Sequence, residues 1–210
     1  MTHSNMKSPT ILAIDSTSGS CSVSIWKNNA ISIYCEELSA SLQAKRLIQM
    51  VEEALDESKT QYGDFSAIAC TIGPGSFTGI RIGLASARAI GFAAKIPVLG
   101  FNSLEVMAFG ARLQKPDAPI LAILNAGKGE AIYQRFNANF EALCPPTLVA
   151  QHLAPAQDSS ITITFPRADF LAELAATHPE RAVAPLPFYV RPPDAKLPQN
   201  NKNKSNVATQ

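Results

Sequence analysis

The segment TIGPGSFTGIRIGLASARAIGF, residues 71–92, constrains the fold more than any other part of this 210-residue chain. It continues from a short apolar run into a helix-forming stretch that contains Gly79, Gly83 and Gly91 and has no clear polar face. Each glycine inside a helix costs roughly 1 kcal/mol relative to alanine. Glycines retained at that cost indicate the close approach of another backbone, and a helix without a polar face is buried on more than one side. The segment therefore predicts unusually deep burial or a partner protein docked over this helix.

The helical positions divide into two groups. One side is predicted to face a sheet and consists of Ile80, Leu84, Ala87 and Gly91. Small or apolar residues remain on other sides, at Gly83, Ser86, Ala89 and Ile90. Arg81 and Arg88 are seven residues apart, which places them on one side of the helix, where they flank the predicted contact.

The loop before this helix, Gly73-Pro74-Gly75-Ser76-Phe77-Thr78-Gly79, has two interpretations. Backbone N–H groups at a helix start can hold an anion. The glycine spacing, however, is G-x-G-x-x-x-G rather than the dinucleotide G-x-G-x-x-G, and no Lys-Ser/Thr pair follows as in a phosphate loop. The alternative is a tight turn in which Ser76 or Thr78 caps the helix.

The first half of the chain has the element order of a ribonuclease-H-like lobe. Strict alternation predicts a hairpin over 21–27 and 31–37 with Asn28-Asn29 at its turn. Matching the apolar faces pairs Ile25 with Ile33, which requires a three-residue loop or a bulge. Buried strands are predicted at 11–15, 67–72 and 96–99, and helices at about 41–58, 77–94 and 103–113. The prediction is a mixed α/β sheet covered on both faces.

The second half carries weaker patterns. Strands are predicted at 119–124 and 130–136 with NAGKG as their turn, a weak strand at 162–165, a helix at 168–177, and a closing strand or strap at 186–193. The predicted organisation is a disordered N-terminus at 1–9, a first lobe at 10–105, a smaller second lobe at 106–195 and a disordered polar tail at 196–210.

Composition narrows the function classes. The net charge of +1 gives no strong field for nucleic acid or an anionic membrane. Four scattered cysteines without a C-x-x-C pair indicate reduced core residues of a cytosolic protein. The first ten residues lack an apolar signal core and no apolar run reaches the length of a membrane span, so a cytoplasmic location is expected.

The polar residues give little support for catalysis. The histidines, His3, His152 and His178, have no metal-ligand spacing, so no metal site is predicted. Asp15 ends the first strand and has two interpretations. It caps the following loop, or it lies near the phosphates of a bound nucleotide, where Ser76 and Thr78 would lie as well. The second lobe places Asn125 where a second carboxylate would be needed. Trp26 and Tyr34 on the hairpin are expected to pack under a helix rather than to stack on bases.

Four stretches of the chain resemble the TsaB (YeaZ) family: ILAIDSTSGSCSVSIW, GPGSFTGIRIGLASARAIGFAAKIPVLGFNSLE, GKGEAIY and FYVRPPDAK. The resemblance covers most of residues 10–135 and a patch near 188–196. It implies an actin-like (ASKHA) fold of two ribonuclease-H-like lobes with a reduced second lobe. It also implies a non-catalytic, cytoplasmic subunit that binds the catalytic paralogue TsaD, which transfers threonylcarbamoyl to the tRNA adenosine beside the anticodon.

The resemblance further implies TsaE as an additional component, a homodimer through the same helix, tRNA contact only through the complex and no membrane. No intrinsic cofactor is expected, with ATP or ADP only at the interface. The partner-binding positions that it indicates are Gly73, Pro74, Gly75, Ser76, Phe77, Thr78, Gly79, Arg81, Ile82, Gly83, Ser86, Ala87 and Ile90, joined by Leu47 and Met50 of the preceding helix.

The chain departs from the family pattern in several places. The second-lobe stretch D-A-R-x-G-E is here Asn125 to Glu130 without the Asp and the Arg, and Gln43 stands where a His is common. Ser103 and Met107 stand where TsaD-type enzymes have their metal-binding histidines. A partner-binding subunit is therefore the first hypothesis. The alternative is an actin-like ATP hydrolase or kinase acting through Asp15 and the glycine loop.

Overall fold

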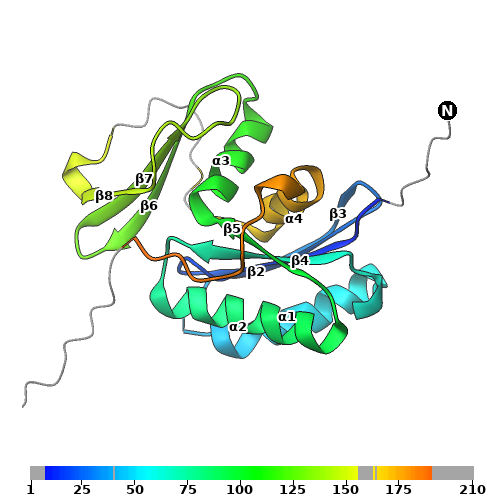
Figure 1. Ribbon diagram of the computed structural model, residues 1–210. Helices are drawn as coiled ribbons and strands as arrows, with labels where there is room; N and C mark the ends of the chain where they lie inside the picture. Colours follow the sequence, from blue (N-terminus) through cyan, green and yellow to red (C-terminus); the bar gives the residue numbers. More distant parts are fainter. Residues whose placement is uncertain (1–7, 40, 156–162, 164, 191–210) are drawn as a thin grey trace, which may run out of the picture.

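The computed structural model describes residues 8–39, 41–155, 163 and 165–190, which form two β-sheets and the helices around them (Figure 1). The first sheet contains β1 (Ile11–Asp15), β2 (Cys21–Lys27), β3 (Ala30–Glu37), β4 (Ala67–Gly73) and β5 (Val98–Asn102). The second contains β6 (Ile120–Gly127), β7 (Glu130–Phe136) and β8 (Thr147–Ala150). The helices are α1 (Gln43–Ser58), α2 (Phe77–Ala94), α3 (Ser103–Gln114) and α4 (Ala168–Thr177), with short 3-10 helices η1 (Tyr62–Asp64), η2 (Gln151–Leu153) and η3 (Pro179–Arg181).

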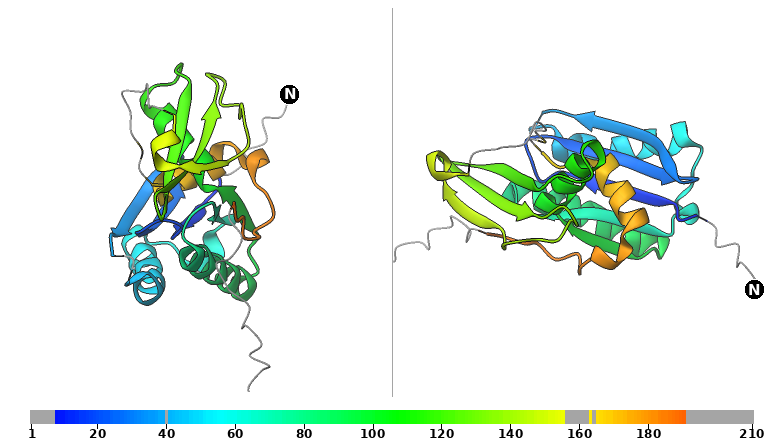
Figure 2. Two further views of the ribbon diagram at one scale, coloured as in Figure 1. Left: turned by 90° about the vertical axis from the view of Figure 1, so that its left-hand side faces the viewer. Right: turned by 90° about the horizontal axis from the view of Figure 1, so that it is seen from above.

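The first sheet has the strand order β3-β2-β1-β4-β5. β2 runs antiparallel to β1 and β3, whereas β4 is parallel to β1 and to β5. α1 and α2 lie side by side under one face of this sheet, and α3 and α4 lie over the other face (Figures 1 and 2). The ribonuclease-H-like order and the mixed sheet covered on both faces are therefore confirmed.

The hairpin contains the predicted bulge. Ile25 pairs with Ile33, and the register shifts between Ile25 and Trp26. Asn28 and Asn29 both have positive φ, 56° and 61°, as a tight hairpin turn requires. Ile25 and Ile33 therefore lie on the face that packs on α1 and α2, whereas Trp26 and its partner Ile31 lie on the opposite face.

The other face of the hairpin packs under α4, as predicted for Trp26 and Tyr34. Trp26 is buried, and the guanidinium of Arg167, at the start of α4, lies 4.6 Å from the Tyr34 ring centre. The N–H of Ala168 donates a 3.0 Å hydrogen bond to Ser22 Oγ on β2. α4 thus belongs to the sequence range 106–195 but covers the first sheet.

Two apolar cores lie on the two faces of the first sheet. One fills the space between the sheet and the helices α1 and α2, and its fully buried side chains include Leu12, Ile14, Ile25, Leu47, Ile68 and Ile80. The other joins the sheet to α3, α4 and the second sheet, and it includes Phe101, Leu104, Met107, Phe136 and Leu171. Because the second core is shared by both sheets, their packing is continuous.

Several element predictions need correction. The strand expected at 96–99 is β5, Val98–Asn102, because Pro97 has no N–H and the N–H of Ile96 bonds to Gly91 O at the end of α2. The NAGKG turn is shorter than expected, since β6 continues through Gly127. β8 was not predicted. Of the weak strand predicted at 162–165, Thr162 and Thr164 lie outside the described residues and Ile163 and Phe165 are not in a strand; most of 1–9 and all of 196–210 also lie outside the described residues.

Residues 182–190 follow η3 as an extended segment, here called the strap, which runs past β5 towards the start of α2 (Figure 1). Val183 and Gly100 exchange two 2.9 Å backbone hydrogen bonds, and the N–H of Phe188 donates to Ile72 O at 2.8 Å. The prediction of a closing strap at 186–193 is confirmed for residues 186–190, whereas Arg191 lies outside the described residues. No helix in the described part of the chain is long and apolar enough to cross a membrane.

Candidate functional site

The glycine loop is a capped turn. Ser76 Oγ accepts a 3.2 Å hydrogen bond from the N–H of Gly79, which makes Ser76 the N-cap of α2. The N–H of Ser76 donates to Thr17 O at 2.6 Å and so ties the loop to the segment after β1. Of the two interpretations drawn from the sequence, the structure shows the turn-and-cap geometry.

The helix glycines of α2 pack against this chain itself. A side chain on Gly79 would collide with the backbone oxygen of Ser16, and one on Gly83 would lie 2.5 Å from Ser16 Oγ. A side chain on Gly91 would meet Val98 and the Ile96 backbone. Of the two predictions, deep burial or a docked partner, the close approach at these glycines is made within this chain, by Ser16 after β1, by Ile96 just before β5 and by Val98 at its start.

Asp15 lies at the end of β1 and is completely buried. Its Oδ1 accepts hydrogen bonds from Thr71 Oγ1 at 2.5 Å and from Thr17 Oγ1 at 2.7 Å, and Ser103 Oγ donates in turn to Thr17 Oγ1. Its Oδ2 has no hydrogen-bond partner. Burial raises the pKa of Asp15 to about 6, although the bonds from Thr71 and Thr17 oppose this shift. Asp15 therefore ties β1 to β4 and the start of α3 rather than facing solvent.

A cleft of about 790 Å³ lies between the segment after β1, the glycine loop, the β6–β7 turn and the strap. Its polar lining includes Ser18, Ser76 and Asn125, and its apolar lining includes Phe188 and Tyr189. The volume is in the range of small-molecule sites. Ser76, one of the three residues predicted to lie near a nucleotide, borders the cleft, whereas Asp15 and Thr78 do not line it.

The structure divides the predicted partner-binding residues into three groups. The exposed ones are Gly75, Ser76, Phe77, Thr78 and Arg81, and the half-buried ones are Ile82, Ser86 and Ile90. The buried ones are Gly73, Pro74, Gly79, Gly83, Ala87, Leu47 and Met50. The side chains of Leu47, Met50 and Ala87 are at most 1% exposed and belong to the core under the sheet, so they are core residues and not surface residues.

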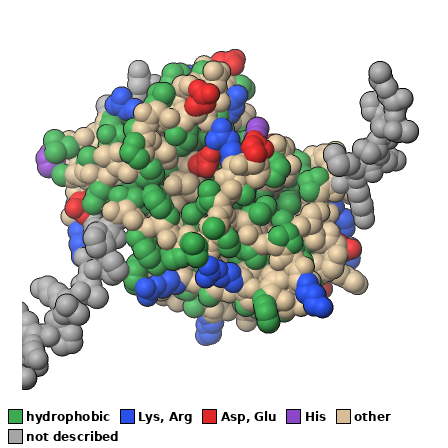
Figure 3. All heavy atoms as spheres, viewed as in Figure 1, with side chains coloured by type: hydrophobic (Ala, Val, Ile, Leu, Met, Phe, Trp, Pro, Cys, Tyr) green, Lys and Arg blue, Asp and Glu red, His purple; other side chains and the backbone are tan. Residues whose placement is uncertain are grey.

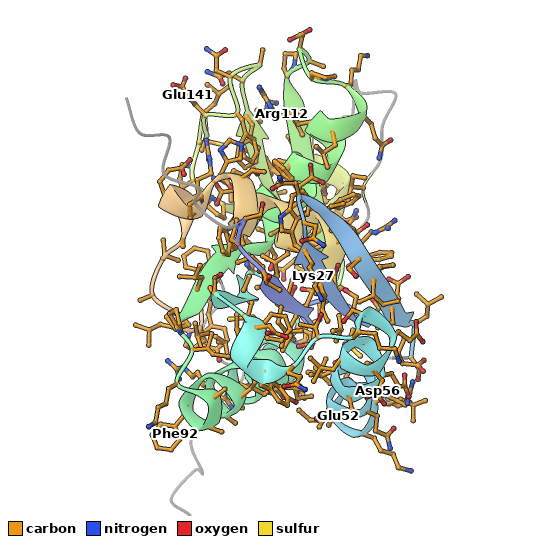
Figure 4. All side chains as sticks on the ribbon, turned by 90° about the vertical axis from the view of Figure 1, so that its right-hand side faces the viewer. Lys27, Glu52, Asp56, Phe92, Arg112 and Glu141 are labelled. Atoms are coloured by element: carbon orange, nitrogen blue, oxygen red, sulfur yellow. The ribbon has the colours of Figure 1, made fainter. Side chains whose placement is uncertain are left out.

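The outward side of the α1–α2 pair carries apolar residues that the sequence reasoning missed. Ile48 on α1 is 45% exposed and Phe92 on α2 is 90% exposed. Phe92 points away from the body of the protein at the end of α2 (Figure 4). We call this surface the α1–α2 face, and its members are Ile48, Ile82, Ala85, Ser86, Ala89, Ile90 and Phe92. In the sequence, the helical spacing of Ala85, Ala89 and Phe92 puts them on the side of α2 opposite the sheet-facing residues, and this pattern could have indicated an exposed apolar face.

Phe77, Arg81 and Tyr189 connect the start of α2 to the strap. The Arg81 guanidinium lies 3.7 Å from the centre of the Phe77 ring, and Arg81 Nε donates to Tyr189 Oη at 3.3 Å. The Phe77 and Tyr189 rings are 5.0 Å apart. The strap thereby holds one predicted partner-binding side chain, Arg81, against Phe77 and Tyr189, which both line the cleft.

The chain is similar to proteins of tRNA threonylcarbamoyladenosine biosynthesis. The family model TsaD, tRNA N6-adenosine threonylcarbamoyltransferase, matches residues 37–176. The Escherichia coli protein TsaB is 33% identical over 162 residues, which cover 73% of this chain and 70% of that protein. A tRNA N6-adenosine threonylcarbamoyltransferase of Erythrobacter litoralis is 43% identical over 77 residues, 37% of this chain and 22% of that protein. The solved structure of YeaZ from Pseudomonas aeruginosa superimposes with a TM-score of 0.75 at 23% identity, covering 87% of this chain and all of that one.

Proposed function

Because the chain belongs to the TsaB (YeaZ) family, we propose that it is a non-catalytic subunit of tRNA threonylcarbamoyladenosine biosynthesis. In this proposal it binds a TsaD-type paralogue through the α1–α2 face and holds that enzyme in an active arrangement. The paralogue transfers the threonylcarbamoyl group, and this chain supplies no reacting group.

The α1–α2 face carries the proposal. Ala85, Ala89 and Phe92 form an outward strip on α2, and Ile48 lies on the neighbouring helix. Phe92 is almost fully exposed, although an aromatic ring of this size gains from burial. An exposed apolar surface on two neighbouring helices, with small residues next to a large one, is typical of a protein interface.

The similarity to TsaD itself supports the choice of partner. A model of the TsaD family matches residues 37–176, which include α1 and α2. A paralogue of this kind can present an equivalent helix pair, so that the two chains pack with near-twofold symmetry. A second copy of this chain has the same geometry, and a homodimer through the same face is therefore the competing assembly.

The environment of Asp15 supports a non-catalytic role. Its carboxylate is completely buried, and Oδ1 is occupied by hydroxyl donors of this chain. A carboxylate that positions a metal-bound phosphate must reach the ligand. Within the described residues, no group of three His, Cys, Asp or Glu side chains is arranged to hold a metal ion.

The remaining components belong to the larger assembly in this proposal. ATP or ADP binds at the border between this chain and its partner, next to the N-terminal end of α2, where Ser76 meets the cleft. A TsaE-type ATPase joins the complex, and tRNA is reached only through it, since the net charge of +1 provides no electrostatic footprint. Titrating ADP into the complex and into each chain alone tests this part, because only the complex is expected to bind.

Gel filtration of this chain with the TsaD-type paralogue of the same organism tests the main proposal. A stoichiometric heterodimer is expected, and the Ile48→Glu and Phe92→Glu variants should prevent it. Leu153→Glu is the matched control, because Leu153 is 66% exposed on η2, outside the face. Gly83→Arg is unsuitable, since Gly83 packs on Ser16 and a long side chain there perturbs the fold. If the wild type forms the heterodimer and both face variants still form it, the assignment of the interface to the α1–α2 face is wrong.

The enzyme alternative has its own test. ATP turnover by the isolated chain, abolished by Asp15→Ala, would establish an actin-like hydrolase or kinase. The expected result is no turnover by the chain alone and stimulation of tRNA modification when it is added to the paralogue.

A further inference from the structure

We propose that the partner surface continues from α2 across the strap, and that the partner carries carboxylates opposite a row of three basic residues, Arg81, Arg88 and Lys95. This inference rests on the proposed function, because it gives the chemistry of the partner at the same site.

The basic row follows from helical spacing. Arg81, Arg88 and Lys95 are separated by seven residues each, so they lie along one side of α2 and its C-cap. The bond from Arg81 Nε to Tyr189 Oη shows that this side is the one next to the strap. Figure 3 shows basic side chains gathered over α2, directly below an area of hydrophobic side chains over the strap.

Apolar side chains flank the row on both sides. On the strap, Val183 is 53%, Leu186 58% and Phe188 37% exposed. On the other side of the row, further around α2, lie Ala85 and Phe92 of the α1–α2 face. Exposed apolar residues that gather beside an interface extend the area that a partner can bury. A partner that covers both apolar areas must also cover the cations between them.

The chain offers these cations no anion of its own. Neither α2 nor residues 182–190 contain an Asp or a Glu, and none of the three basic residues forms an ion pair with the part of the chain that the structure describes. The acidic residues Glu52 and Asp56 lie on α1 (Figure 4), on the far side of α2 from the strap. Covering an unpaired guanidinium or ammonium is strongly unfavourable, whereas a carboxylate opposite it restores the lost interaction. A partner surface complementary to this one is therefore apolar on both sides and carries carboxylates in between, opposite the basic row.

Two variants and two matched controls test the inference with the purified TsaD-type paralogue of the same organism. Arg88→Gln removes one charge of the row, and Arg135→Gln removes an exposed charge on β7. Leu186→Ser removes an apolar contact of the strap, and Leu153→Ser removes an exposed leucine on η2. The Kd is measured for each variant by isothermal titration calorimetry at about 50 mM and about 300 mM NaCl, because charge pairs weaken as salt screens them.

Arg88→Gln is expected to raise the Kd about tenfold at low salt and to reduce its salt dependence, while Leu186→Ser raises it about tenfold at both salt concentrations. The two controls are expected to bind as the wild type does. If the wild type binds, Ile48→Glu prevents binding and both row and strap variants bind normally, the inference is wrong and the proposed function stands. If the wild type does not bind, the proposed function fails together with the inference. If the variants alter only self-association, the occupant is a second copy and the inference is overturned.

Discussion

Ser16 and Gly79 join the end of β1 to the first turn of α2. Ser16 Oγ donates a 2.7 Å hydrogen bond to Gly79 O, and the backbone oxygen of Ser16 occupies the space where a side chain on Gly79 would begin. The contact brings the loop that borders the cleft and the helix of the α1–α2 face into one rigid corner. Any added atom at this corner must move a backbone segment rather than the end of a flexible side chain.

Gly79→Ala is therefore expected to lower the free energy of unfolding by about 1 to 3 kcal/mol, the cost of forcing an extra carbon into a packed core. Urea denaturation measures this change. Gly63→Ala is the control, because nothing lies within 4 Å of the added carbon there, and its effect should stay within about 0.5 kcal/mol. Equal effects of both substitutions would contradict the proposed packing.

Asp15→Asn is expected to change how stability depends on pH. Burial raises the pKa of Asp15 to about 6 from its ordinary value of 3.8, so the folded protein favours the protonated form. The resulting stabilisation is fully present below the unfolded pKa and is lost as the pH rises through about 6. Asparagine cannot ionise, and its free energy of unfolding relative to wild type should rise by about 3 kcal/mol between acidic and neutral pH.

Thermal unfolding of both proteins at about pH 4 and about pH 7.5 measures this difference. Asp117→Asn is the control for replacing an exposed aspartate by asparagine. A constant difference between wild type and Asp15→Asn at both pH values would show that the pKa of Asp15 is the same in the folded and unfolded protein, which contradicts a pKa raised by burial.

Gln43→Leu is expected to loosen the segment after β1. Gln43 Nε2 donates to Ser18 O at 2.8 Å and to Ser20 O at 2.7 Å, and these carbonyls are left without that donor when leucine replaces it. Stability should fall by about 1 to 3 kcal/mol, and amide hydrogen exchange should accelerate over residues 16–20. The exposed Gln49→Leu on the same helix is the control. Unchanged exchange over 16–20 in Gln43→Leu would refute the assignment.

Lys27→Met is expected to weaken the end of α1. Lys27 Nζ donates to Ser58 O at 3.4 Å, Lys59 O at 3.3 Å and Thr60 Oγ1 at 3.2 Å, where the helix dipole is negative. Replacement by an apolar side chain of similar length should cost about 1 kcal/mol, measured by chemical denaturation. Lys45→Met, on an exposed turn near the start of α1, should cost less. A loss that is no larger for Lys27 than for Lys45 would mean that the cap contributes nothing.

The alternation and periodicity of neighbouring residues predicted those strands and helices whose pattern lies within one short segment of the chain. The bulge at Ile25 followed from matching apolar faces across the hairpin, and α4 was predicted with the bounds that the structure has, Ala168–Thr177. β8 was missed because it is a four-residue strand of half-buried residues that directly follows Pro145-Pro146 and so lacks a strand pattern. The position of α4 over the first sheet depends on contacts between distant segments, which no local pattern reports.

The candidate site was predicted only in part, because it too depends on contacts between segments that are distant in the sequence. The sequence showed that Gly79 and Gly83 require a close neighbour but could not show that the neighbour is Ser16 of the same chain. Periodicity placed Ala87 on the sheet side correctly, but Ala87, Leu47 and Met50 were also assigned to the partner surface, although all three are core residues. Phe92 was overlooked because an exposed aromatic residue in an apolar helix has the same sequence pattern as a buried one.

The hydrogen bond between Ala168 and Ser22 spans 146 residues of sequence, which sets an order of events during synthesis. The hairpin that contains Ser22 leaves the ribosome early, but its Trp26 face stays uncovered until α4 emerges. A nascent chain that ends before Ala168 therefore carries a bare apolar sheet surface and is a substrate for chaperones. The same holds for truncated expression fragments: a piece that stops after the second sheet contains every strand that the structure describes, yet it lacks α4, which covers β1, β2 and β3.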